Sequence, residues 1–131
     1  MNGTSGHGAI DILAPEGTPV VAVADGKLEN VGWNTLGGNR LHVITDAGDD
    51  FYYAHLKRYA NGLKSGDTVR AGQVIGYVGK TGQSGDVFHL HFAWKPAGMS
   101  SYSNPFSFLN KLWDALTKPS TTVRSAKTYL A

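Results

Sequence analysis

The chain has 131 residues and a formal net charge of +2 at pH 7. This length corresponds to one domain that can bury about two thirds of its unfolded surface. The basic residues are dispersed, which argues against a dedicated nucleic-acid surface, and the apolar runs are much shorter than a membrane span. Cysteine is absent. Disulfides, a thiolate nucleophile and a cysteine-held zinc are therefore excluded, and a metal would need His, Asp or Glu ligands.

The first half of the chain alternates β-rich runs with turn signals. Residues 20–24 and 27–33 flank the Asp25-Gly26 dipeptide, and this pattern predicts a β-hairpin. A loop is expected at 34–40, followed by strands at 41–45 and 51–56. Short strands at regular spacing favour an all-β fold, mainly an antiparallel sheet or a β-sandwich-like core.

The second half continues the pattern and ends differently. Two short strands are expected within 68–79, and a flexible loop at 81–86 leads into the next strand. One short amphipathic helix is predicted over 108–116, where Lys118-Pro119 stops it. The polar composition of 119–131 predicts a flexible tail.

A His-x-His pair occupies the segment 88–92, which reads FHLHF. Side chains alternate between the faces of a strand, so His89 and His91 share one face while three apolar residues share the other. Two imidazoles on one face can share a metal site. Two histidines on a solvated strand face remain the alternative interpretation.

His7 and Asp11 lie four residues apart near the start of the chain. In a straight strand their Cα atoms would be about 13 Å apart. Both could reach one ion only if the chain bends between them; otherwise they are a flexible histidine and a turn-capping aspartate. With His91 they would form a His, Asp, His donor set that suits Zn²⁺ and leaves a fourth position open for water. His89 would then face that water or the substrate.

The other two histidines lie on predicted strands. Alternation places Tyr53 and His55 on one face and Ala54 and Leu56 on the other. His55 by itself is consistent with a structural role. His42 has no partner motif and is expected to be an exposed strand residue.

Taken together, these segments form a series of motifs in a fixed order. The motifs are His7-x-x-x-Asp11, Ile12-x-Ala14-Pro15-x-Gly17-Thr18-Pro19-Val20, Ala24-x-Gly26, Gly38-Asn39, Tyr53-x-His55-Leu56, Gly66-Asp67-x-Val69-x-x-Gly72-Gln73-x-Ile75-Gly76, Gly79-x-Thr81-Gly82 and His89-Leu90-His91-Phe92. The series resembles the lysostaphin-type, LytM-like zinc metalloendopeptidases that cut peptidoglycan peptides. The resemblance covers about residues 7 to 110 and implies a peptidase domain over 1–118.

The resemblance implies a role for each of the site residues. His7, Asp11 and His91 would hold Zn²⁺, and His55 and His89 would flank the reacting centre as catalytic residues. One of these two histidines would act as general base, and the sequence leaves open which one, because no His-Glu-x-x-His helix supplies a glutamate.

Substrate contacts are also implied by the resemblance. Asn39, Tyr53 and Thr81 would bind the substrate peptide in a groove. The groove would be walled by three loops, at 33–39, 81–87 and 96–104.

The expected activity is hydrolysis of peptide bonds in peptidoglycan cross-bridges or stem peptides by a monomer that is secreted or acts in the cell envelope. This location comes from the resemblance, since residues 1–6 lack the charged start and apolar region of a signal peptide. A non-catalytic peptidoglycan-binding or hydrolase-activating module of the same fold is the main alternative. A biotinyl- or lipoyl-type carrier domain is the other, suggested by residues 69–76, but such a domain has no use for the arranged histidines.

Overall fold

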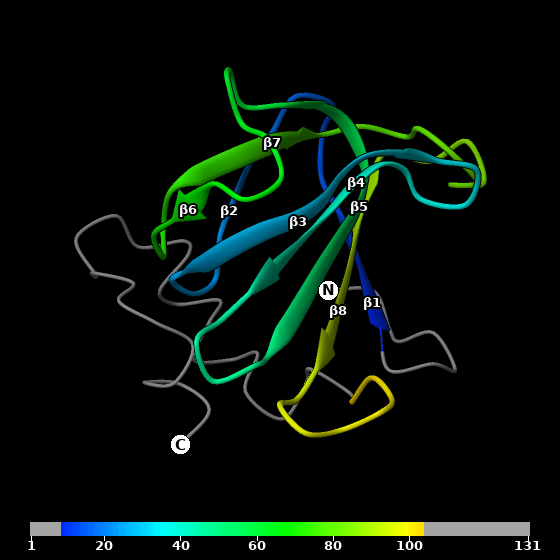
Figure 1. Ribbon diagram of the computed structural model, residues 1–131. Helices are drawn as coiled ribbons and strands as arrows, with labels where there is room; N and C mark the ends of the chain where they lie inside the picture. Colours follow the sequence, from blue (N-terminus) through cyan, green and yellow to red (C-terminus); the bar gives the residue numbers. More distant parts are fainter. Residues whose placement is uncertain (1–8, 104–131) are drawn as a thin grey trace.

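The computed structural model describes residues 9–103 of the chain. Within this range it contains strands and no helix, which confirms the all-β prediction (Figure 1). His7, the helix predicted at 108–116 and the tail predicted at 119–131 lie outside the described residues. The strands are β1 (Ala9–Leu13), β2 (Pro19–Val21), β3 (Gly26–Asn34), β4 (Gly38–Ile44), β5 (Asp50–Tyr59), β6 (Thr68–Val69), β7 (Val74–Val78) and β8 (His89–Lys95).

All strand pairs are antiparallel and belong to one sheet. The strand order is β1-β8-β5-β4-β3-β6, and β7 pairs with both β2 and β5. Figure 1 shows β1 at one edge, beside β8 and β5. The beginning, the middle and the end of the described chain therefore lie side by side on neighbouring strands.

The hydrophobic core covers one face of β5 and β8. Phe51 and Phe92 stack with ring centroids 6.0 Å apart, and Tyr53 meets Phe92 edge-on at 5.2 Å. All three side chains are buried. Because side chains alternate along a strand, residues 52 and 54 of β5 and residues 91 and 93 of β8 point to the opposite face.

The hairpin predicted over 20–33 is wrong. β2 pairs with β7, and β3 pairs with β4 and β6. The Asp25-Gly26 dipeptide does not close a two-residue turn, because the Asp25 carboxylate accepts a hydrogen bond from the Ala71 amide at 2.8 Å. Ala22 likewise bonds with Gly72 and Gln73. The segment after β2 is thus held by the turn at 71–73 and does not fold back on itself.

The other predicted strands are confirmed. β4 and β5 correspond to the strands expected at 41–45 and 51–56, and β6 and β7 to the pair expected within 68–79. The loop expected at 34–40 is shorter, because β3 and β4 form a hairpin whose turn is only residues 35–37. That tight turn approaches the histidines. No helix in the described part of the chain could span a membrane.

Candidate active site

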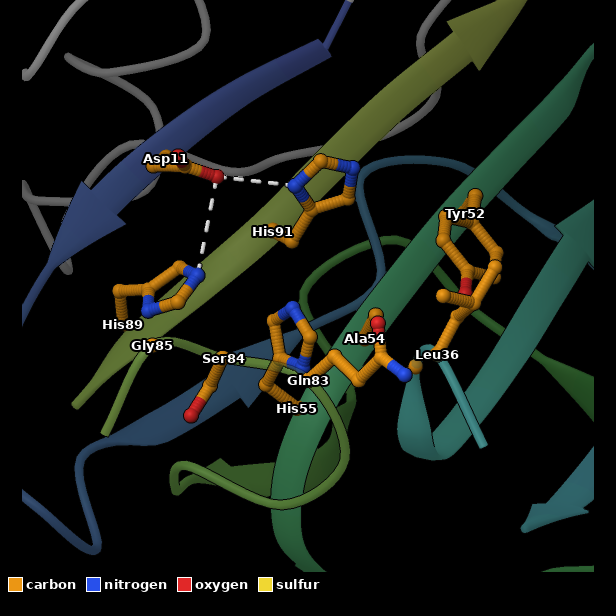
Figure 2. Close-up of a pocket in the computed structure, with 11 residues that line it drawn as sticks. Asp11, Leu36, Tyr52, Ala54, His55, Gln83, Ser84, Gly85, His89 and His91 are labelled. Carbon is orange, nitrogen blue, oxygen red and sulfur yellow. Dashed lines mark hydrogen bonds and ion pairs between the residues drawn. The ribbon is translucent and has the colours of Figure 1, made fainter. Parts of the chain in front are cut away.

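Asp11 and His91 are brought together by the pairing of β1 with β8, in which they are direct partners. Asp11 Oδ1 lies 2.8 Å from His91 Nδ1 and 3.7 Å from His89 Nε2 (Figure 2). These residues are 80 positions apart in the chain. The register of an edge strand, which the sequence pattern does not reveal, thus places the carboxylate beside both histidines of the His-x-His pair.

His89 and His91 share a face of β8, as alternation predicts. His89 is buried, with 7% of its surface exposed. Its Nδ1 lies 2.8 Å from the Val87 carbonyl oxygen, and only an N–H can bond to a carbonyl. In the neutral imidazole, Nε2 therefore keeps its lone pair on the side of Asp11.

His55 reaches the same site through an unusual backbone conformation. Simple alternation would place it with Tyr53 on the core face, but its φ is +64°, and the pairing of β5 with β4 shifts register between Tyr53 and Leu56. The predicted pairing of Tyr53 with His55 on one face is therefore wrong. Figure 2 shows His55 turned toward His89 and His91, with ring centroids 4.8 and 5.8 Å away.

Two backbone contacts fix His55 in this position. Its amide donates to the Gly37 carbonyl at 2.7 Å, and its Nδ1 lies 2.7 Å from the Thr81 carbonyl oxygen. Burial lowers the pKa of His55 below its usual value, and the Thr81 carbonyl offsets part of that effect. Nδ1 carries the proton in this contact, so the neutral ring presents Nε2 as a proton acceptor.

Asn39 and Thr81 are both engaged in hydrogen bonds within the protein. The Thr81 hydroxyl donates to the Leu56 carbonyl at 2.7 Å and accepts from the Asn39 amide at 3.1 Å. The Asn39 side-chain amide donates to the carbonyls of Leu56 and Lys57. Neither residue lines the cavity that Asp11 and the three histidines border. The structure thus gives both side chains a structural task, which joins the loop at 79–88 to β4 and β5.

Tyr53 is predicted to bind substrate, and the structure contradicts this. It is 1% exposed, and its hydroxyl accepts a hydrogen bond from the Val23 amide at 2.9 Å. Burial raises its pKa far above the usual value. The neighbouring Tyr52 points to the open face and lines the cavity. Alternation along the strand predicts this, because if the apolar Phe51 faces the core, Tyr52 must face the opposite side.

The cavity at this site has a volume of about 490 Å³. The hairpin turn supplies Leu36 and Gly37, and the loop at 79–88 supplies Gln83, Ser84 and Gly85. The Gln83 amide donates to the Leu36 carbonyl at 2.9 Å, so the two walls are joined. Sequence reasoning expected these two loops at the groove but not the individual side chains. No described residue of the third expected loop, 96–104, lines the cavity.

His42, expected to be an exposed strand residue without a partner, is mostly covered. Its side chain is 16% exposed, and its Nδ1 lies 2.7 Å from Asp50 Oδ1. Its ring also contacts Tyr52, with centroids 4.8 Å apart. The expectation was wrong because β4 is an interior strand, so its open face is flanked by side chains of β5.

The donor atoms at this site fit a metal ion of the zinc type. Donor nitrogens of His55, His89 and His91 lie within 4.8 Å of one another, and the Asp11 carboxylate is in contact with the last two. Imidazole and carboxylate are zinc ligands, and two of the imidazoles direct an unprotonated nitrogen toward the site. The arrangement can hold a cation and move protons beside it.

Comparison with known proteins agrees with this geometry. The chain belongs to peptidase family M23, whose model matches residues 5–105. It is 42% identical to the glycyl-glycine endopeptidase ALE-1 of Staphylococcus capitis over 94 residues, covering 70% of this chain and 25% of that protein. It is 36% identical to the L-Ala--D-Glu endopeptidase of Bacillus subtilis (strain 168) over 116 residues, covering 82% of this chain and 35% of that protein.

The fold is also that of a solved member of this group. The catalytic domain of lysostaphin from Staphylococcus simulans superposes with a TM-score of 0.71 at 38% identity, covering 79% of each chain. The resemblance to lysostaphin-type enzymes is thereby confirmed. The matches span only about a quarter to a third of the two full-length relatives, with 25% and 35% of their lengths covered.

Proposed function

We propose that the protein is a zinc-dependent endopeptidase that hydrolyses peptide bonds in peptidoglycan cross-bridges or stem peptides. The observation that carries this proposal is the convergence of Asp11, His55, His89 and His91 on one cavity of an M23 fold. The relatives named above are peptidases of glycyl-glycine and L-Ala--D-Glu bonds. Such a substrate places the protein's site of action in the cell envelope or outside the cell.

Zinc would be held by His7, Asp11 and His91. The direct Asp11–His91 contact of 2.8 Å supports two of these ligands, and His7 lies two residues before β1, which carries Asp11. A bound zinc ion polarises a carbonyl and lowers the pKa of a water molecule. The three imidazoles of His55, His89 and His91 form an alternative ligand set, and His91 belongs to both.

His55 and His89 would carry the proton transfers. Each has Nδ1 fixed on a backbone carbonyl and Nε2 available at the cavity. One would accept the proton of the attacking water at Nε2 and return it to the leaving amine. The other, when it carries a second proton on Nε2, would donate a hydrogen bond to the oxygen that becomes negative. The backbone contacts prevent either ring from rotating away, which keeps the acceptor atoms in place.

The test is the release of new amino termini from purified peptidoglycan, with and without a chelator. We expect release that stops with chelator and returns with added zinc, at about one zinc per molecule. His91→Ala should lose both the zinc and the release. His89→Ala should keep the zinc and lose turnover if Asp11, His91 and His7 are the ligands, and should lose the zinc if the three imidazoles are.

A binding module is the alternative that this assay separates from a hydrolase. A zinc-loaded protein that sediments with peptidoglycan and never releases amino termini would overturn the proposal. The filled set of donors at the cavity favours hydrolysis, because binding alone does not require two histidines with fixed proton positions.

A further inference from the structure

The open face of the sheet continues beyond the cavity along β5 and β8. Tyr52 of β5 pairs with His42 of β4 and with Ala93 of β8, and Asp50 pairs with Lys95. Alternation places Asp50 and Tyr52 on the face of Ala54, and Lys95 on the face of His91. A row of polar side chains therefore extends from the histidines toward the far end of both strands.

Direct contacts connect this row. The Tyr52 ring lies 6.1 Å from the His91 ring and 4.8 Å from the His42 ring. Asp50 Oδ1 accepts a hydrogen bond from His42 Nδ1 at 2.7 Å. The Lys95 ammonium lies 3.9 Å from the Asp50 carboxylate and 5.9 Å from the centre of the Tyr102 ring. We call this set the Lys95 surface; its members are His42, Asp50, Tyr52, Lys95 and Tyr102.

The more exposed charge of this surface is the positive one. The Asp50 side chain is 13% exposed and already accepts a hydrogen bond from His42, whereas the Lys95 side chain is 36% exposed. The Lys95 ammonium and Asp50 form an ion pair at 3.9 Å, which is longer than a hydrogen bond. Within residues 9–103, no side chain or carbonyl accepts a hydrogen bond from this ammonium. The negative charge is thus mostly covered and the positive charge is accessible.

Neighbouring groups add further donors and positive charge. Burial and the nearby Asp50 raise the pKa of Tyr102, so its hydroxyl remains a donor. Burial raises the pKa of Tyr52, and the positive charge of Arg40 counteracts part of that effect. An ammonium beside a hydroxyl donor is complementary to a carboxylate.

The distance along β8 from His91 to Lys95 indicates how far the Lys95 surface lies from the bond that is cut. Lys95 is four residues after His91 on one strand, which corresponds to about 13 Å at roughly 3.3 Å per residue. A peptide bound in extended form along the strands has the same rise per residue. A substrate residue that contacts Lys95 would therefore lie three or four residues along the peptide from the bond that is cut beside the histidines.

We propose that the Lys95 surface binds a carboxylate of the substrate peptide, three or four residues from the bond that is cut. This inference rests on the proposed endopeptidase function and names one chemical feature of its substrate. Lys95 supplies the charge and Tyr102 a hydrogen bond, while Asp50 and His42 hold the surface in shape. The contact lies outside the reacting centre, so it affects binding of substrate rather than the chemical step.

The test uses synthetic peptides that contain the bond identified by the amino-terminus assay. Each carries Glu or Gln at one position, three or four residues away from that bond on either side. The wild-type protein should cleave one Glu peptide about tenfold more efficiently in kcat/KM than its Gln partner, mainly through KM. Lys95→Gln should cleave both equally, Lys95→Arg should keep the preference, and Lys95→Glu should reverse it.

Lys64→Gln is the matched control, because its ammonium is exposed and pairs with Asp67 in the loop before β6. It should behave as wild type. Equal cleavage of all Glu and Gln pairs by the wild type, or an unchanged preference in Lys95→Gln, would overturn the inference while cleavage itself persists. If wild type cuts neither these peptides nor peptidoglycan, the proposed function fails and the inference with it.

Discussion

The two ends of the open sheet face are built in different ways. At the histidine end, His55 and His89 are each fixed by a backbone carbonyl of the loop at 79–88. At the other end, the contacts of Lys95 and Asp50 among the described residues are with side chains, and 36% and 13% of their own side chains are exposed. Proton transfer requires fixed distances, whereas attraction of a charged group tolerates adjustment. On this one surface, the backbone therefore fixes the side chains that would transfer protons, and the charged side chains at the other end keep more freedom.

The largest effect is expected from removing an imidazole at the histidine end. His55→Ala should retain zinc and lower kcat by about 10²- to 10⁴-fold, because a positioned proton acceptor or oxyanion donor is lost. Metal content and the amino-terminus assay measure the two properties separately. If His55→Ala loses zinc, His55 is a ligand and the proposed ligand set of His7, Asp11 and His91 is wrong.

The rigid support of that end can be weakened without touching a histidine. A Cβ on Gly82 would lie 2.2 Å from the Gly38 nitrogen and 2.7 Å from the Leu36 carbonyl oxygen, and because both are backbone atoms a whole segment must shift to relieve the collision. Gly82→Ala should push the loop away from the hairpin turn and take the Thr81 carbonyl from His55. Since a misplacement of about 1 Å can reduce turnover about 100-fold, we expect a loss of that order.

The matched control for this variant is Gly62→Ala. Gly62 has a similar φ of +77°, against +73° for Gly82, but nothing lies within 4 Å of its Cβ position. It carries the same backbone strain without the collision. Equal losses of activity in the two variants would mean that strain alone, and not the contact between loop and turn, is responsible.

The smallest effect on activity is expected on the opposite face of β5. Tyr53→Phe leaves the buried Val23 amide without its acceptor, which should lower the free energy of unfolding by about 1–3 kcal/mol. Turnover of the folded protein should be unchanged, since the side chain points into the core. Denaturant unfolding and substrate KM distinguish the outcomes, and a raised KM would restore Tyr53 as a substrate contact.

Local patterns predicted the strands better than their partners. The strands containing Leu41, Phe51 and Val74 were readable because each combines β-rich composition with turn residues at its ends. The partner of β2 was not readable. Asp25-Gly26 suits a hairpin turn, but the choice between folding back and packing on the turn at 71–73 depends on contacts that are distant in sequence.

The site was predictable in its residue types and less so in its geometry. Alternation correctly placed His89 and His91 on one face, and the motif order placed Asp11 and His55 with them. Alternation failed at His55, because a single residue with positive φ changes the direction of its side chain, and no feature of the segment 53–56 signals it. The hydrogen bonds of Asn39 and Thr81 within the protein could not be predicted from the sequence, because they join residues that are distant in the chain. Their role in substrate binding stays a prediction.

The backbone conformation of His55 also carries a cost in stability. A non-glycine residue at φ +64° carries a conformational penalty of about 1 kcal/mol that glycine does not. His55→Gly would relieve this strain, but it would also remove a buried imidazole and its contact with the Thr81 carbonyl. The strained backbone and the packed side chain thus offset each other in stability, and the net result of the bend is the position that it gives the imidazole.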